Sequence, residues 1–137
     1  MTSVPPDAQA PQEWRDGQGR LHREDGPAWV SSSGAEEWRR HGELHRVGGP
    51  AMVKEHALIW AVDGRRHRLD GPAVVYRDGT VEWWVDGARI HGQDADLLAE
   101  VHDAGEAELL VAVLEGWKPG VDVRALVGEK RRELGLS

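Results

Sequence analysis

A His-Arg pair occurs three times in this 137-residue chain, and each copy is followed, after two further residues, by Gly-Pro-Ala. The copies read LHREDGPAWV from Leu21, LHRVGGPAMV from Leu44 and RHRLDGPAVV from Arg66. Imidazole rings and carboxylates can hold a metal ion or transfer protons, so these stretches carry the clearest chemistry in the sequence. The repetition is either a repeated catalytic device or a repeated piece of architecture.

A metal site is not expected at these histidines. Zinc needs three or four ligands that converge within about 2.3 Å of the ion. His22, His45 and His67 are 23 and 22 residues apart, and successive hairpins of a sheet are separated by roughly 10 Å, which is two strand spacings. Within one copy the second ligand would be the acid of Glu-Asp or Leu-Asp, but Gly48 replaces that acid in the second copy. We therefore predict neither a metal site nor a cofactor site.

General acid–base catalysis needs one pocket in which a pair of groups has shifted pKa values. Three nearly equal copies provide no such pair. The chain also contains no G-x-S-x-G, no Gly-rich phosphate loop and no H-E-x-x-H, which are motifs of common enzyme classes. We therefore predict no catalytic residues. Each His and Arg is expected to bond carbonyl groups of a connecting segment, and Arg23 and Arg68 are also expected to pair with Asp25 and Asp70.

The spacing of the copies predicts a repeat architecture, because a fixed period of 20–50 residues is typical of proteins built from stacked structural units. Successive histidines of the pattern are 23, 22 and 24 residues apart. The fourth unit, which ends at Gly92, is a truncated terminal copy. The residues that recur in register are Trp14, Trp38, Trp60 and Trp83, then His22, His45, His67 and His91, and finally Pro27, Pro50 and Pro72.

Within each unit the sequence favours β-hairpins. PAVVYRDGTVEWWVDG has β-branched and aromatic residues on both sides of Asp78-Gly79, a pair that favours the positive φ angles of a tight turn. The two earlier units repeat this plan with Ser-Ser-Gly and His-Ala at the bends, and each first strand is expected to begin with Pro. We therefore expect six short strands in three hairpins, joined by connectors with glycine at both ends.

These units resemble MORN repeats, which are aromatic-led hairpins with G-x-x-H near the middle. EWRRHGELHRVGGPA is similar to the divergent W-x-x-x-G-x-x-H-R-x-x-G-P-A variant of bacterial and viral proteins. The resemblance covers residues 13–92. It implies an elongated, twisted antiparallel sheet of successive hairpins, and a role as a protein-binding, scaffold or lipid-associated module. Some bacterial relatives of this kind are antitoxin-like.

The pattern changes to helix after Gly92. Apolar residues at helical spacing in DADLLAEVHDAG, EAELLVAVLEGW and VDVRALVGEKRREL predict three short helices, with Asp122 as the N-cap of the last. Helices of this length are not stable alone in water, so they are expected to pack on the sheet and cap its final hairpin. The predicted organisation is a disordered lead over 1–12, MORN-like repeats over 13–92 and a helical cap over 93–137. The predicted fold class is mainly β with α.

Tryptophan dominates the aromatic residues, with seven Trp, one Tyr and no Phe. The four recurrent tryptophans are expected to stack as a ladder on one face, where each would bury about 150–250 Å². Trp83 and Trp84 are neighbours on one strand and must face opposite sides of the sheet. Trp29 and Trp84, together with Arg39 and Arg77, are therefore candidate partner-binding residues on the second face. Burial under the C-terminal helices is the alternative for these tryptophans.

Charge and composition narrow the function classes. The net charge is −7, and residues 93–137 hold ten acids and five bases, which disfavours binding to nucleic acid or to an anionic membrane. The chain has no cysteine and therefore no disulfide framework or thiolate metal site. No signal peptide and no 18-residue apolar run is recognisable, so a cytoplasmic location is expected.

Two functions remain open on the residues alone. The first is a non-enzymatic protein-binding module, such as an immunity or antitoxin-like protein or a scaffold, whose partner is another protein. The alternative is a nucleic-acid or anionic-lipid binder in which arginines on the repeats act together with interleaved tryptophans. The arginines available for this are Arg15, Arg20, Arg23, Arg39, Arg40, Arg46, Arg65, Arg66, Arg68, Arg77 and Arg89.

Overall fold

The computed structural model describes residues 10–136 of the chain. Residues 1–9 of the predicted lead lie outside the described residues, whereas Gln12 belongs to the first strand. The strands are β1 (Gln12–Glu13), β2 (Trp29–Val30), β3 (Glu36–Glu37), β4 (Arg39–Arg40), β5 (Glu43–Leu44), β6 (Met52–Val53), β7 (Ala57–Ile59), β8 (Ala61–Val62), β9 (Arg65–Arg66), β10 (Val74–Tyr76), β11 (Val81–Val85) and β12 (Ala88–Ile90). The helices are α1 (Gly92–Asp103), α2 (Ala107–Gly116) and α3 (Val123–Glu133).

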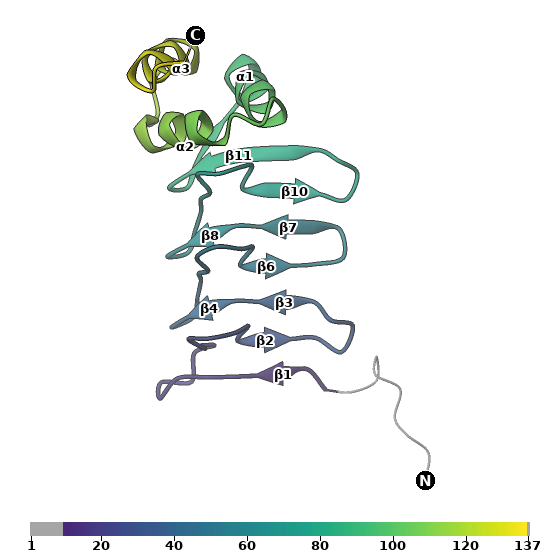
Figure 1. Cartoon of the computed structure of the whole chain (residues 1–137). Helices are drawn as coiled ribbons and strands as arrows, with labels where there is room; N and C mark the ends of the chain where they lie inside the picture. Colours follow the sequence, from purple (N-terminus) through teal and green to yellow (C-terminus); the bar gives the residue numbers. More distant parts are fainter. Residues whose placement is uncertain (1–9, 137) are drawn as a thin grey trace. The chain divides into compact units, whose positions relative to one another are not determined.

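Eight of these strands belong to one antiparallel sheet with the order β1-β2-β3-β6-β7-β10-β11-β12, while β4-β5 and β8-β9 form two-stranded ladders (Figure 1). Three helices follow the last strand, which confirms the predicted fold class. The chain divides into two compact units. The first unit comprises residues 1–65 and 75–80, and the second unit comprises residues 66–74 and 81–137.

The register of the first unit aligns residues in rows across its strands. One row consists of Glu13, Trp29, Glu37, Met52 and Ile59. Residues that lie directly opposite one another share a face of the sheet, and the neighbouring row lies on the other face. That neighbouring row consists of Gln12, Val30, Glu36, Val53 and Leu58.

Tight turns that were not expected form at the ends of the predicted second strands, two of them where a connector was expected to begin. β4 and β5 pair across a turn made by His41 and Gly42, whose φ angles are 49° and 86°. Asp63-Gly64 has φ angles of 50° and 80°, and Asp86-Gly87 has 49° and 81°. Positive φ at both central residues is typical of the type I′ turn, which matches the twist of two short antiparallel strands. The described chain therefore has more strands than the six expected.

The bend at Asp78-Gly79 also differs from the prediction. Only Gly79 has a positive φ, of 93°. Tyr76 N donates to Thr80 O at 2.9 Å, and Gly79 N donates to Tyr76 O at 3.0 Å. This is a three-residue loop with glycine at its left-handed position, which is the next most common hairpin connection.

The bend of the second copy lies one residue earlier than expected. Lys54 N donates to Ala57 O at 3.0 Å, so Glu55-His56 is the bend. Ala57, which the sequence predicts in the bend, is the first residue of β7. The recurrent prolines are also displaced, because Pro50 precedes the first residue of β6, Met52, by two positions. The other two copies have the same offset.

The first unit has strands and turns but no helix among its described residues. Over residues 10–65 and 75–80, the buried apolar side chains of this unit are all alanines, namely Ala28, Ala51 and Ala61. The larger apolar residues of its strands are half-buried, because a sheet without a second layer cannot cover both faces. This unit is consequently held together by backbone pairing and by contacts along its surface.

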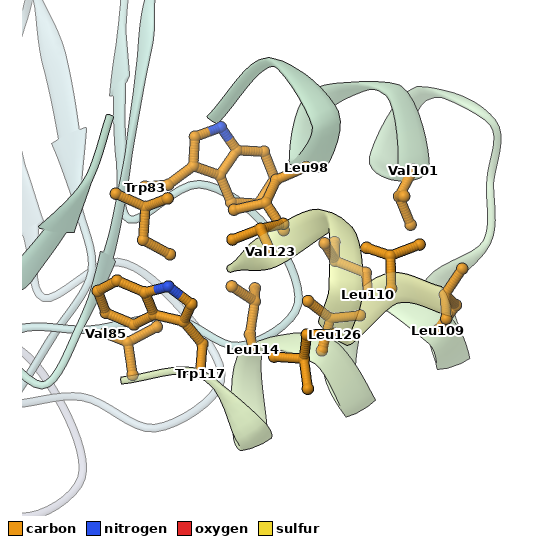
Figure 2. Close-up of a cluster of buried hydrophobic side chains, with 13 residues drawn as sticks. Trp83, Val85, Leu98, Val101, Leu109, Leu110, Leu114, Trp117, Val123 and Leu126 are labelled. Atoms are coloured by element: carbon orange, nitrogen blue, oxygen red, sulfur yellow. The ribbon is translucent and has the colours of Figure 1, made fainter. Parts of the chain in front are cut away.

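The second unit has a hydrophobic core in which the last hairpin and the helices meet (Figure 2). Its members are Trp83, Val85, Ile90, Leu98, Val101, Leu109, Leu110, Val113, Leu114, Trp117, Val123, Leu126 and Val127. Asp122 accepts a hydrogen bond from Arg124 N at 2.9 Å, which confirms it as the N-cap of α3. Within residues 10–136, no helix combines the length and apolar character that crossing a bilayer requires.

Candidate binding site on the repeats

The first three recurrent histidines each support a type I′ turn. In every copy the ring Nδ1 accepts a hydrogen bond from the backbone N–H of the first turn residue, which has a positive φ. The donor and acceptor residues are His41 and His22 at 2.9 Å, Asp63 and His45 at 3.1 Å, and Asp86 and His67 at 2.9 Å. An accepting Nδ1 leaves the ring proton on Nε2. The rings therefore accept from an amide instead of donating to a carbonyl as expected.

The fourth recurrent histidine has a different position. His91 is exposed and is the N-cap residue of α1, with no hydrogen bond from its side chain to the first turn of the helix. This agrees with the truncated sequence of the terminal copy, in which Gly92 follows the histidine in place of arginine.

The arginines that follow the first two histidines lie against indole rings. Arg46 Cζ is 3.7 Å from the ring centroid of Trp38, and Arg23 Cζ is 4.1 Å from that of Trp14. Contacts of this kind contribute about 0.5–2 kcal/mol. A Cβ at Gly49 would lie 2.7 Å from Arg46 Cζ, so the glycine leaves the space that the guanidinium occupies.

A carbonyl group completes the contacts of each arginine, and a carboxylate does so in two copies. Nη1 donates to the carbonyl of the recurrent proline, with distances of 3.4 Å at Pro27, 3.1 Å at Pro50 and 3.0 Å at Pro72. Arg68 Nε donates to Asp70 Oδ1 at 2.8 Å, and Arg23 Nε lies 3.5 Å from Asp25 Oδ1. Both ion pairs were expected from the sequence.

The second copy lacks these acids. Val47-Gly48 stands where the first copy has Glu24-Asp25. No carboxylate among residues 10–136 pairs with Arg46. In the first copy, Oε1 of Glu24 also lies 3.0 Å from Nε2 of His22. The corresponding Val47 is 82% exposed.

A pocket of about 220 Å³ lies beside Arg46 in the first unit. Its lining residues are Arg23, Glu24, Trp38, Arg40, His45, Arg46 and Val47. Three guanidinium groups thus share the pocket with a single carboxylate. From the sequence, Arg46 was expected to bond a carbonyl of its connector, and both Arg40 and Arg46 were counted among the arginines of the alternative function. The absence of the acid at Gly48 was the signal that could have identified this pocket.

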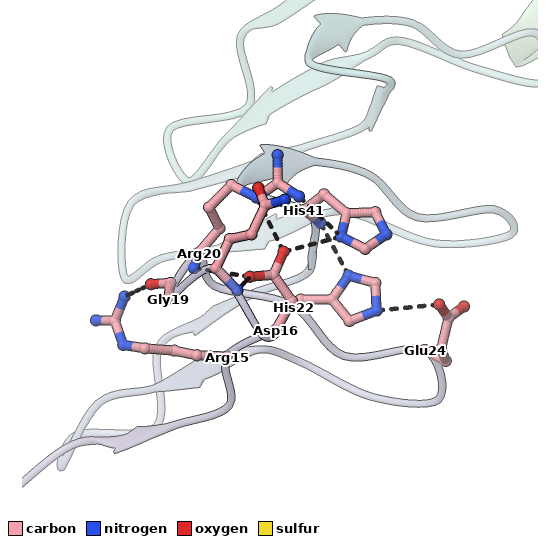
Figure 3. Close-up of polar contacts among 8 residues, drawn as sticks. Arg15, Asp16, Gly19, Arg20, His22, Glu24 and His41 are labelled. Atoms are coloured by element: carbon pink, nitrogen blue, oxygen red, sulfur yellow. Dashed lines mark hydrogen bonds and ion pairs between the residues drawn. The ribbon is translucent and has the colours of Figure 1, made fainter.

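Asp16 is the centre of a polar cluster in the first loop (Figure 3). Its Oδ1 accepts from the backbone N–H groups of Gln18 and Arg20 at 2.8 and 3.0 Å. Its Oδ2 contacts Arg20 Nε and His41 Nδ1, each at 2.9 Å. The hydrogen bond with His41, supported by those from Arg20 and Gln18, holds the pKa of Asp16 well below its usual range.

The same cluster brings together three possible metal ligands. Candidate ligand atoms of Asp16, His22 and His41 lie within 4.8 Å of one another. However, Nδ1 of His22 accepts from the His41 amide, and the two rings are stacked with centroids 4.0 Å apart. The Arg20 guanidinium also adds a positive charge at Asp16. The geometry is that of an ion-pair network in which a cation would have to displace Arg20.

The recurrent tryptophans have equivalent positions but different surroundings. Trp14 and Trp38 are half-buried beneath their arginines, and their backbone N–H groups donate to Ala28 O and Ala51 O at 2.8 and 2.6 Å. Trp60 is half-buried as well. Trp83 is 2% exposed and belongs to the core of the second unit, where its ring meets His102 edge-on at 5.9 Å.

Two of the four candidate partner-binding residues form one cluster around Glu37. This carboxylate accepts from Arg39 Nε at 2.8 Å and from Lys54 Nζ at 3.0 Å, and Lys54 Nζ lies 4.6 Å from the ring centroid of Trp29. Burial alone would raise the pKa of Glu37, but the hydrogen bonds from Lys54 and Arg39 outweigh burial and lower it. Trp29 and Arg39 therefore have internal partners.

The other two candidates lie elsewhere. Arg77 is in the first unit, with its side chain 75% exposed and its Nη1 3.8 Å from Glu55 Oε1. Trp84 belongs to the second unit and is half-buried, with Nε1 donating to Glu82 Oε1 at 2.8 Å. The Arg66 guanidinium lies 5.1 Å from the Trp84 ring centroid. The printed contacts join Trp29 and Arg39 in one cluster, whereas Arg77 and Trp84 have other partners.

Comparisons of the chain with protein-family models, with curated proteins and with solved structures find no match. The chemistry of the site is therefore interpreted from its own geometry. Most of the repeated His and Arg side chains bond backbone groups or acids of the same unit. The pocket at Arg46 differs because its cations exceed its acids, so it can accept an anionic group from outside the chain.

Proposed function

We propose that this chain is a non-enzymatic, cytoplasmic protein-binding module built from MORN-like repeats, of the antitoxin-like or scaffold kind. The observation that carries the proposal is the incomplete burial of the first unit. Val30, Val53 and Leu58 lie in one row across its sheet and are only half-buried. The row also contains Gln12 and Glu36, and large apolar side chains that no second layer covers are typical of a surface that another protein covers.

Tryptophan adds to this surface. Trp38 Nε1 donates to Glu36 Oε1 at 3.1 Å, and Glu36 lies in the same row as Val30 and Val53. The Trp38 ring therefore lies on the same face as these valines. Tryptophan and arginine are the residues that most often dominate the binding energy of protein interfaces.

The pairing of the arginines disfavours the alternative, binding to nucleic acid or anionic lipid. Phosphate recognition needs several free cationic groups along one path. In this chain Arg15, Arg20 and Arg39 each pair with an acid two or four residues away, at 2.6, 2.9 and 2.8 Å. These pairs lower the positive potential of the repeat surface, and the net charge of −7 adds to the effect.

The proposal is tested by cross-linking the tagged full-length chain in its host, identifying the attached proteins and reconstituting each pair from purified components. We expect one partner to bind with a Kd that changes less than about tenfold between roughly 50 and 200 mM salt, because apolar burial dominates the interface. A phosphate-binding surface with six or more contacts would instead lose about 10³-fold. Tight, steeply salt-dependent retention of duplex DNA, single-stranded RNA or anionic vesicles would replace the proposal with its alternative.

Co-expression distinguishes the two kinds of protein partner. An antitoxin-like role predicts that the partner inhibits growth when it is expressed alone and that this chain restores growth. A scaffold role predicts no toxicity of the partner. Either result supports the proposed protein-binding function, whereas the failure of every reconstituted pair to bind would contradict it.

A further inference from the structure

The three His-Arg copies allow an internal comparison at the positions that follow the arginine. In the third copy, Arg68 Nε donates to Asp70 Oδ1 at 2.8 Å. In the first copy, Arg23 Nε lies 3.5 Å from Asp25 Oδ1. The fold thus places a carboxylate next to the Nε edge of this arginine. In the second copy, Gly48 takes the place of the acid and leaves the same edge of the guanidinium without a carboxylate.

The guanidinium of Arg46 is held in position without that acid. One of its faces covers the ring of Trp38 at 3.7 Å, and Gly49 leaves it the space that a Cβ would occupy. Its Nη1 donates to Pro50 O at 3.1 Å. These contacts fix the plane of the group, so the Nε edge keeps one direction. A donor edge oriented in advance loses little entropy when it binds a carboxylate.

The surroundings of this edge favour an anion that is attached to an apolar residue. Arg40 lines the same pocket and is exposed. His45 also lines the pocket. In the first copy Glu24 contacts the equivalent histidine, His22, and the residue of the second copy at the position of Glu24 is Val47. Val47 is 82% exposed, and the other copies have Glu or Leu at this position.

We propose that the pocket at Arg46 receives an Asp or Glu side chain from the partner protein, with an apolar residue of the same segment resting on Val47. The inference rests on the proposed function and specifies the chemistry of the partner at this point. The internal ligands of the other copies are carboxylates, and the pocket volume of about 220 Å³ suits one side chain. An acidic group of the partner therefore pairs with Arg46 in the second copy, as Asp25 pairs with Arg23 and Asp70 pairs with Arg68 in the other copies.

A carboxylate is favoured over a phosphate of nucleic acid by the rest of the surface. Glu24 is part of the pocket lining and would repel a strongly charged polyanion. The net charge of −7 acts in the same direction. A single carboxylate needs only the bidentate edge of one arginine, and Arg46 lines the pocket without a carboxylate partner among the described residues.

The test uses the full-length chain and two capped pentapeptides, acetyl-Leu-Asp-Leu-Asp-Leu-amide and its analogue with Asn in place of Asp. Nitrogen-15 labelling makes the arginine Nε–H signals visible by NMR, and Arg46→Lys assigns the signal of Arg46. We expect the acidic peptide to move this signal with a saturable, millimolar Kd. The Asn peptide should bind at least about tenfold more weakly, because it lacks the charge that strengthens the hydrogen bonds.

Val47→Glu and Val47→Gln form a matched pair at an exposed position. Val47→Glu adds a negative charge to the pocket lining, at the position that Glu24 has in the first copy, so it should repel the acidic peptide and weaken its binding about tenfold. Val47→Gln has the same length without the charge, so it loses only the apolar contact on Val47 and should weaken the acidic peptide clearly less than Val47→Glu does. Melting temperatures of both variants equal to that of the wild type show that the fold is intact.

Three results would overturn the proposal. These are equal binding of the Asp and Asn peptides, an unchanged Kd in Val47→Glu, and a larger shift of the Arg46 signal with a single-stranded oligonucleotide than with the acidic peptide. The reconstituted partner separates this proposal from the proposed function. If Val47→Glu leaves the partner's Kd unchanged, the protein-binding function stands and the pocket proposal fails.

Discussion

The backbone N–H of His41 donates a hydrogen bond of 2.9 Å to Nδ1 of His22, although the two residues are 19 positions apart. His41 has a φ of 49°, a conformation that few residues other than glycine adopt. The imidazole therefore satisfies an amide at a strained position. The same relationship between a histidine and the next turn occurs at His45 and His67. The repeated histidine is thus a long-range support for a repeated turn.

His45→Ala should destabilise the protein by about 1–2 kcal/mol, because the amide of Asp63 loses its acceptor. Chemical unfolding followed by tryptophan fluorescence measures the change. His91→Ala is the matched control, since this histidine is exposed and forms no cap hydrogen bond with α1. A loss of stability in both variants, or in neither, would contradict the supporting role of the ring.

Gly49→Ala should lower stability by about 1–2 kcal/mol. Its Cβ would lie 2.7 Å from Arg46 Cζ, and the guanidinium would have to leave both Trp38 and the carbonyl of Pro50. Gly17→Ala is the control, because no atom lies within 4 Å of its added Cβ. The melting temperature reports the change, and an unchanged melting temperature in Gly49→Ala would show that the stacked arginine contributes nothing.

The pH dependence of stability should contain a contribution from Glu37. Its pKa is lowered in the folded state from the usual value of 4.5, so the folded protein binds fewer protons here than the unfolded chain does. This stabilisation is complete above about pH 4.5 and decreases as the pH falls through the lowered pKa. Melting temperatures of Glu37→Gln should accordingly decrease less than those of the wild type between neutral pH and about pH 3.

Glu55→Gln is the control for this measurement. The side chain of Glu55 is 79% exposed, and its nearest ionic contact is 3.8 Å long, to Arg77. Both substitutions remove one negative charge from the first unit. If the two variants show the same dependence on pH, the effect comes from net charge and the cluster of Glu37 with Arg39 and Lys54 is not its source.

The sequence predicts the type and order of the elements well. Period-two patterns identify the hairpins, and apolar residues at helical spacing identify all three helices, because each signal extends over at least one complete element. The turns at Asp63-Gly64 and Asp86-Gly87 were missed although Asp-Gly is a hairpin signal. The strands on either side of Asp63-Gly64 have only two residues each, which is too short for a visible alternation.

The side-chain contacts of the repeats were harder to predict because their partners are distant in sequence. His22 and its turn are 19 residues apart, and Lys54 reaches Glu37 over 17 residues. No local pattern indicates such pairs. The missing acid at Gly48 is visible in the sequence, but its consequence depends on knowing which edge of Arg46 the other copies pair with a carboxylate.

Removal of residues 93–137 should cause the remaining chain to aggregate. Trp83, Val85 and Ile90 are 2%, 6% and 2% exposed and share their core with the helices. Without the helices these three side chains would form an exposed apolar patch on the last hairpin, which is a common cause of association. Size-exclusion chromatography with light scattering measures the outcome.

Leu110→Ala provides a milder version of the same experiment in the full-length chain. Leu110 is 1% exposed and lies in α2, so the substitution should cost about 2–5 kcal/mol through the cavity that it leaves. This loss should appear in the unfolding of the second unit, and the shift of the Arg46 signal with the acidic peptide should persist, because the pocket belongs to the first unit. A truncated chain that stays monomeric and folded would show that the helices do not protect the last hairpin, and would indicate a separate binding element in residues 93–137.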